Sequence, residues 1–151
     1  MTTDVAAGPS HVLTPVVVVA ERGKLRSFAA ATGQTDPIYS DIDAARAAGH
    51  PDLPIPPTFY FSLELVRPDP FDWIAALGKD LNRVLHGEQS FEFHAMAYAN
   101  EPLTLTSRIV DVESKRGGAL ELITKRTEVT RGSAPIATGT SVIVVRNGAL
   151  V

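Results

Sequence analysis

The chain contains no cysteine, few aromatic residues and no long hydrophobic segment. The absence of cysteine from its 151 residues excludes disulfide bonds, thiolate metal sites and a cysteine nucleophile. No uninterrupted apolar run is longer than Val16 to Ala20, which is far too short to span a membrane. Asp4 precedes that run and no lysine or arginine does, so it lacks the basic start of a signal peptide. We therefore expect a cytoplasmic protein without a membrane segment.

An excess of basic charge is also lacking. The formal net charge is −3 and 21% of the residues are charged, so the chain has no basic surface of the kind that binds phosphate backbones, and we expect no nucleic-acid partner. No two histidines have metal-ligand spacing with a carboxylate, and we expect no metal site. The length and the 44% hydrophobic content are those of one globular domain with its own core.

The first half of the chain predicts short elements around one apolar helix. Gly8-Pro9 and Pro15 predict a loose arm over residues 1–15, followed by a single domain over residues 16–151. Further elements are a strand over 16–19, helices over 21–31 and 41–49, and a small amphipathic piece over 71–77. Thr58–Val66 is apolar on nearly all sides, which predicts a buried helix, and Pro57 suits its first position.

The second half predicts an antiparallel sheet. Its β-rich runs cover residues 84–94, 103–113, 120–130 and 135–146. Gly117-Gly118 separates two of these runs and predicts a hairpin. Together the halves predict an α+β fold in which the sheet wraps around one central buried helix. Because so small a sheet leaves exposed edges, we expect at least a dimer.

Four stretches occur in the order that they have in MaoC-like hot-dog dehydratase domains: 28–41, 44–49, 56–59 and 84–91. The chain most resembles the N-terminal type of this domain, found as one half of two-domain enoyl-CoA hydratases and as small subunits of acyl-thioester dehydratases. The resemblance implies a hot-dog fold and a lyase of fatty acid metabolism. Such an enzyme hydrates or dehydrates an acyl-CoA or acyl-carrier-protein thioester, as an enoyl hydratase or 3-hydroxyacyl dehydratase, with no bound metal or redox cofactor.

The catalytic motif of that family is altered here. Catalytic relatives carry Gly-Asp-x-Asn-Pro-apolar-His after the first helix, and the Asp and His act together in proton transfer. On this motif, Gln34 stands in place of the Asp and Tyr39 in place of the His. A glutamine amide takes no proton at neutral pH, and a phenol with a pKa near 10 is a poor base. The usual acid–base pair is therefore missing on this alignment.

Three interpretations of this departure stay open. In the one we favour, the chain is the substrate-binding subunit of a heteromeric enzyme whose other hot-dog chain holds the Asp/His pair. In the second, a self-sufficient homodimer uses Asp36 and His86 for proton transfer, and Tyr39 orients substrate or water. In the third, the chain is a hot-dog thioesterase or a non-catalytic acyl-thioester-binding protein.

The resemblance also implies substrate-binding groups at the start of the buried helix. In catalytic relatives an amide there points at the thioester carbonyl. Pro57 has no N–H to offer, so Thr58 and Phe59 supply the first available amides. Gln34 and Gln89 are further candidates, because their side-chain amides can hydrogen-bond a thioester or a pantetheine arm.

Ordinary structural roles compete with these assignments. Asp36 stands before Pro37, where an aspartate commonly bonds the backbone of its own turn. His86 precedes Gly87, a residue suited to a β-bulge. Lys125-Arg126 is expected to be a pair of solvated strand charges.

Overall fold

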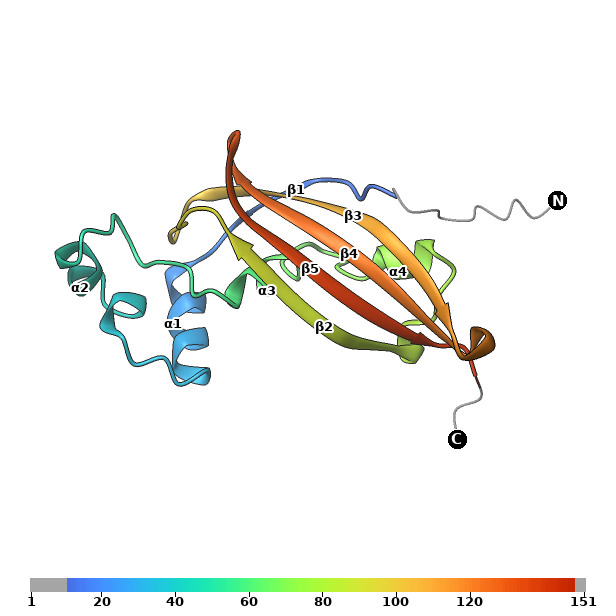
Figure 1. Cartoon of the computed structure of the whole chain (residues 1–151). Coiled ribbons are helices and arrows are strands. Elements are labelled where there is room, and N and C mark those ends of the chain that lie inside the picture. Colours follow the sequence, from blue (N-terminus) through green and yellow to red (C-terminus); the bar gives the residue numbers. More distant parts are fainter. Residues whose placement is uncertain (1–10, 149–151) are drawn as a thin grey trace.

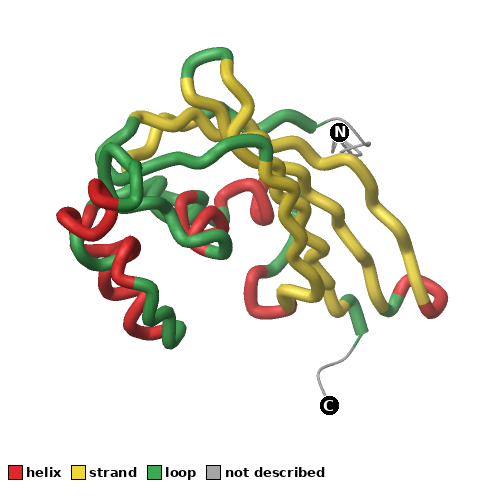
Figure 2. The backbone as a smooth tube through the Cα atoms, turned by 60° about the vertical axis from the view of Figure 1, so that its left-hand side comes forward, coloured by secondary structure: helices red, strands yellow, loops and turns green. Residues whose placement is uncertain are grey.

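A five-stranded antiparallel sheet curves around a short central helix (Figures 1 and 2). The structure is a computed structural model that describes residues 11–148. The strand order is β1-β3-β4-β5-β2, so β1 and β2 form the two edges. The strands are β1 Val16–Val19, β2 Val84–Phe93, β3 Pro102–Lys115, β4 Leu120–Arg131 and β5 Ala134–Arg146. The α+β architecture and the predicted hairpin between β3 and β4 are confirmed.

Alternation of side chains along the strands gives the sheet a buried face. Along β4, Ile123, Lys125, Thr127 and Val129 are all buried, as expected for residues two apart on one face of a strand. Ser107 of β3 lies opposite Thr127, and their buried hydroxyls are 2.8 Å apart and hydrogen-bonded. These two hydroxyls therefore satisfy each other within the sheet.

The helices are short and lie mostly at the two ends of the sheet. They are α1 Arg22–Ala31, α2 Ile42–Ala47, α3 Phe59–Leu63 and α4 Asp72–Ala76, with the 3₁₀ turns η1 Pro37–Tyr39, η2 Leu81–Arg83 and η3 Arg116–Gly118. Figure 1 shows α1 and α2 at one end of the molecule and α4 at the other, with α3 between them. No helix in the described part of the chain is long and apolar enough to cross a membrane.

The central helix is shorter than the sequence predicts. The α-helix α3 ends at Leu63, and the amides of Glu64, Leu65 and Val66 donate to carbonyls three residues earlier. Leu65 and Val66 are exposed, so the predicted buried helix over 58–66 is wrong beyond Glu64. Pro57 precedes the helix cap Thr58 and does not occupy the first helical position.

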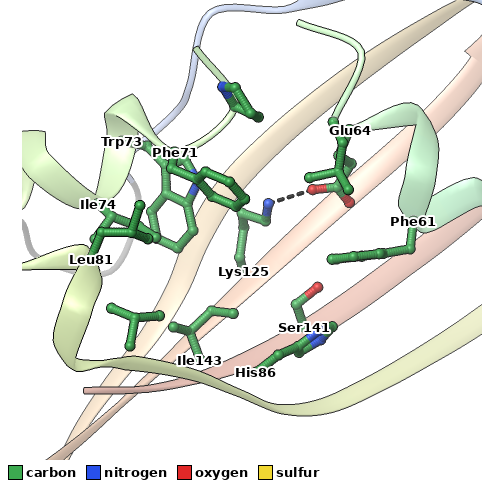
Figure 3. Close-up of a pocket in the computed structure, with 13 residues that line it drawn as sticks. Phe61, Glu64, Phe71, Trp73, Ile74, Leu81, His86, Lys125, Ser141 and Ile143 are labelled. Atoms are coloured by element: carbon green, nitrogen blue, oxygen red, sulfur yellow. Dashed lines mark hydrogen bonds and ion pairs between the residues drawn. The ribbon is translucent and has the colours of Figure 1, made fainter. Parts of the chain in front are cut away.

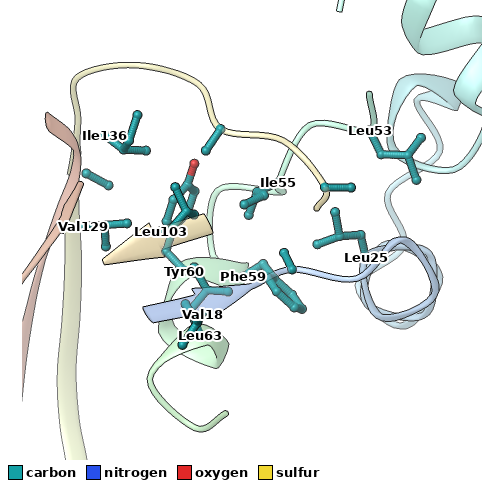
Figure 4. Packing of buried hydrophobic residues seen from close by; sticks show 14 of the residues in the cluster. Val18, Leu25, Leu53, Ile55, Phe59, Tyr60, Leu63, Leu103, Val129 and Ile136 are labelled. Carbon is teal, nitrogen blue, oxygen red and sulfur yellow. The ribbon is translucent and has the colours of Figure 1, made fainter. Parts of the chain in front are cut away.

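Two hydrophobic clusters fill the concave side. The larger one joins α3 to β1, α1 and the loop after α2 (Figure 4) and includes Val18, Leu25, Leu53, Phe59, Tyr60 and Leu63. The smaller one surrounds Trp73 and Ile74 of α4 and includes Ile123 and Ile143 of the sheet. Along β4, Ile123 belongs to the smaller cluster and Val129 to the larger, and the polar Lys125 lies between them in the sequence.

The predicted N-terminal arm is described only in its last part, because residues 1–10 lie outside the described residues. Val12 forms a β-bridge with Arg108, and Leu13 is buried with its amide donating to the Ser107 carbonyl at 2.9 Å. This part of the arm therefore packs along β3.

Candidate functional site

Asp36 and Gln34 belong to the exposed turn between α1 and η1. Asp36 caps η1, and its Oδ1 accepts the Ile38 amide at 3.1 Å. The Gln34 Oε1 accepts the Asp36 amide at 3.1 Å. The ordinary turn role of Asp36 is thus confirmed, and both side chains hold the backbone of this segment.

Tyr39 and Pro57 line a cavity of about 290 Å³, which we name the Tyr39 cavity. The cavity also contains Tyr60 from α3, Phe93 from the end of β2 and His94. Burial raises the pKa of Tyr60 to about 12, so its hydroxyl stays neutral at physiological pH. The His94 Nε2 lies 3.3 Å from the Thr138 hydroxyl. The cavity therefore combines apolar walls with a phenol and an imidazole that can hydrogen-bond a ligand.

His86 lines a different cavity of about 350 Å³, which we name the Lys125 cavity (Figure 3). The His86 ring lies 4.8 Å from the Phe61 ring, and its Nε2 is 3.0 Å from the Glu88 carbonyl oxygen. The pairing of β2 with β5 shifts register between His86 and Glu88, which confirms the bulge predicted at Gly87. At this bulge His86 lines the Lys125 cavity, as Figure 3 shows.

Asp36 and His86 are not brought together within one chain. His86 lies near the start of β2 on the α4 side, whereas Asp36 lies in the segment between α1 and α2. Figure 1 shows these two regions at opposite ends of the molecule. Proton transfer by both groups on one substrate within a single chain therefore has no support in this geometry.

The remaining predicted binding residues are Gln89 on β2 and the neighbours Thr58 and Phe59 at the start of α3. The Gln89 Oε1 accepts a hydrogen bond of 2.5 Å from the Ser141 hydroxyl, which holds the amide against β5. The Phe59 amide donates to the Pro56 carbonyl at 3.0 Å, so it is engaged inside its own turn, contrary to its predicted role as a donor to substrate. Thr58 is exposed at the cap of α3.

A buried ion pair that the sequence analysis missed lies in the Lys125 cavity. The Lys125 Nζ donates to the Glu64 carboxylate, and the two side chains are only 8% and 10% exposed. The same Nζ lies 5.0 Å from the centre of the Trp73 ring, within range of a cation–π interaction. The expectation that Lys125 is solvated is wrong, because it shares the buried face of β4; the neighbouring Arg126 is exposed.

Signals for two of the missed residues were present in the sequence. Two-residue alternation from Ile123 to Val129 places Lys125 on the apolar face, where a charge needs a partner. The second signal is the position of His94, which directly follows Phe93 at the end of β2.

Within residues 11–148, no group of three or more histidines and carboxylates is arranged to hold a metal ion.

The sequence matches the family described as "FAS1-like, dehydratase domain region" over residues 7–139. A UPF0336 protein of Leifsonia xyli is 38% identical over 145 residues, with 92% of each chain covered.

Solved structures share the fold at low sequence identity. The HadBC (3R-hydroxyacyl-ACP dehydratase) complex of Mycobacterium tuberculosis has a chain with a TM-score of 0.74 and 20% identity, covering 95% of this chain and 99% of that one. A chain of the ChsH1-ChsH2 complex from the same organism has a TM-score of 0.72 and 23% sequence identity, and the match covers 93% of this chain and 86% of that one. The (R)-hydratase of A. caviae has a TM-score of 0.67 and 17% sequence identity, and the match covers 92% of this chain and 97% of that one. These similarities confirm the hot-dog fold, and the family match shows that the chain belongs to the family of FAS1-like dehydratase domains.

Proposed function

We propose that the chain is the substrate-binding subunit of an acyl-thioester hydratase or dehydratase, and that a second hot-dog subunit supplies the acid–base pair. The observation that carries this proposal is the separation of Asp36 from His86, together with Gln34 and Tyr39 at the motif positions. The family match supports the reaction class. The neighbours named as the HadBC and ChsH1-ChsH2 complexes support a hot-dog partner.

The Tyr39 cavity is the proposed thioester site. Tyr39 lies at the end of η1, the 3₁₀ turn that carries the altered motif, and the cavity walls are mostly apolar. Phe93 lines the cavity and ends the edge strand β2. A subunit paired along this edge would bring its own side chains to the mouth of the cavity. The fold of one subunit thus leaves the substrate accessible to a base on another.

The proposed division of labour follows from the chemistry. In dehydration, a base removes the proton from the carbon next to the thioester carbonyl. An acid then protonates the hydroxyl on the following carbon, whose C–O bond breaks to release water. We assign both proton transfers to the partner's Asp and His. Tyr39 and His94 hold the acyl thioester by hydrogen bonds, and the substrate carrier is CoA or an acyl-carrier protein of the cytoplasm.

Co-expression with an Asp/His-bearing hot-dog chain tests the proposal. The complex should consume an enoyl thioester chromophore without releasing free CoA, whereas either chain alone should do neither. Tyr39→Phe should lower the kcat/KM of the complex roughly three- to tenfold, the effect of one lost hydrogen bond. Release of free CoA as the main reaction would instead identify a thioesterase.

A lysine introduced on either edge strand tests which edge of the sheet pairs with the partner subunit. Leu85 is 51% exposed on edge strand β2, and Val17 is 65% exposed on the opposite edge strand β1. A lysine on a strand edge opposes pairing with another strand. Leu85→Lys should therefore abolish co-elution and activity, while Val17→Lys should retain both. Equal behaviour of the two variants would contradict assembly through β2.

A further inference from the structure

The Lys125 cavity has the construction of a ligand site and plays no part in the function proposed above. Its volume of about 350 Å³ lies within the range of small-molecule sites. Phe61, Phe71, Leu81 and Ile143 belong to the apolar wall that Figure 3 shows. Phe71 and Leu81 are 44% and 49% exposed, so the entrance presents apolar surface to solvent. An apolar molecule would bury this surface on binding.

The polar residues that line the cavity are Lys125, Glu64, Ser141 and His86. Lys125 and Glu64 are buried as an ion pair, and Ser141 is buried beside them on β5. Figure 3 shows the Lys125–Glu64 contact facing the interior, between the Trp73 and Phe61 rings. An ion pair in such surroundings is weak evidence for stability, because well-packed apolar residues of similar volume often serve the fold equally well.

The ion pair retains hydrogen-bonding capacity toward the cavity. A lysine ammonium has three N–H donors, and among the described residues Lys125 uses one of them, toward Glu64. A carboxylate accepts at up to about four positions, and the Glu64 side chain accepts this one hydrogen bond within the described part of the chain. The site therefore offers a donor and an acceptor side by side at the end of an apolar space.

We propose that the Lys125 cavity binds an aliphatic chain that carries a hydroxyl group. The hydroxyl donates to the Glu64 carboxylate and accepts from the Lys125 ammonium, which uses both charges at once. A ligand carboxylate would be repelled by Glu64, and an alkyl chain without an O–H would leave the carboxylate without a new donor. The chain packs against Phe61, Leu81 and Ile143. Binding requires no partner subunit and no catalysis, so this proposal does not rest on the proposed function.

Trp73 reports on occupancy of the cavity directly. It is the only tryptophan of the chain, it lines the cavity and it lies 5.0 Å from the Lys125 Nζ. The full chain is titrated with octanol, with its isomer heptyl methyl ether, which has no O–H donor, and with octanoate. We expect a saturable change in Trp73 fluorescence with octanol at a Kd about tenfold or more below those of the other two, the effect of a hydrogen bond to a charged group.

Removing the charges of Lys125 and Glu64 should remove the preference for octanol over the ether. The double variant Lys125→Met/Glu64→Leu should bind the ether at least as well as octanol. The matched control Arg108→Met/Glu128→Leu removes an exposed ion pair between neighbouring strands and should keep the preference of the original chain. If the cavity variant fails to fold, amide chemical shifts of the original chain decide: octanol should move those of Lys125 and Ser141 and leave those of Arg108 and Glu128.

Three results would overturn the proposal. Equal affinity for octanol and the ether would mean that the cavity is only apolar. Tighter binding of octanoate would identify an anion site. The absence of a saturable change in both fluorescence and chemical shifts would mean that the cavity binds none of these chains.

Discussion

Removal of one partner of the Lys125–Glu64 pair should destabilise the protein more than removal of both. Lys125→Met leaves the Glu64 carboxylate 10% exposed without its counter-charge and also removes the cation from Trp73. Breaking a buried pair in this way costs about 3–5 kcal/mol. Because the pair adjoins a cavity of about 350 Å³ that opens to solvent, we expect about 3 kcal/mol, the lower end of this range.

The double variant Lys125→Met/Glu64→Leu leaves no unpaired charge. Its apolar side chains have similar volumes and meet Trp73 and Ile143, so its free energy of unfolding should lie within about 1 kcal/mol of the original value. The coupling energy between the two positions should therefore be at least about 2 kcal/mol. A domain with a typical stability of about 5–15 kcal/mol remains folded through each of these changes.

Urea unfolding at neutral pH, followed by Trp73 fluorescence, measures all of these differences. The exposed pair Arg108–Glu128 is the control, and Arg108→Met should change the free energy of unfolding by less than about 1 kcal/mol. The reasoning would be refuted if Lys125→Met and Glu64→Leu each cost under about 1 kcal/mol, or if their costs simply added in the double variant.

The remaining predictions concern stability at three other positions. Hydrogen bonds from Arg22 lower the pKa of Asp52, so the pair stabilises the fold above the unfolded carboxyl pKa of about 4 and loses this contribution as the pH falls. Asp52→Asn should therefore cost on the order of 1 kcal/mol at neutral pH, and this cost should shrink as the pH falls below about 4, as measured by urea unfolding; a cost that does not change with pH would contradict the linkage. Gly87→Ala should destabilise by about 1–3 kcal/mol, because its Cβ would lie 3.0 Å from the Val144 Cγ2 at the bulge. Gly23→Ala should stabilise α1 by about 0.5–1 kcal/mol, because its Cβ meets nothing within 4 Å; thermal unfolding should give the two alanine variants opposite signs.

Local chemistry made most of the strands and turns predictable from the sequence. The four β-rich runs correspond to β2–β5, and Val16–Val19 is β1 with the predicted bounds. Gly33 and Gly49 have φ of 71° and 93° and directly follow Thr32 and Ala48, the C-cap residues of α1 and α2. These features depend on backbone preferences of a few neighbouring residues, which a sequence displays directly.

The extent of α3 was not predictable in the same way. Apolar residues continue through Leu65 and Val66, yet these two are exposed beside Glu64. Glu64 turns toward Lys125, a residue 61 positions later in the chain. The residue that caps α3 thus makes a tertiary contact with β4, which the hydrophobic pattern alone does not contain.

The family was predicted from the sequence, but the geometry of the candidate site was not. The resemblance identified Tyr39 and Pro57, which do share a cavity. It also led to the grouping of Asp36 with His86, which the bulge in β2 and the cap of η1 place in different regions. The distance between Asp36 and His86 depends on how the sheet and the helices are arranged in three dimensions, which the local sequence around each residue does not contain.

Enoyl-thioester hydration by the purified chain, alone and then with a hot-dog subunit that carries Asp and His, tests the central claim most directly. We expect no turnover by the chain alone, and turnover by the mixture that saturates at a fixed ratio of the two subunits. Turnover by the chain alone that is lost in Asp36→Asn or His86→Ala would contradict it.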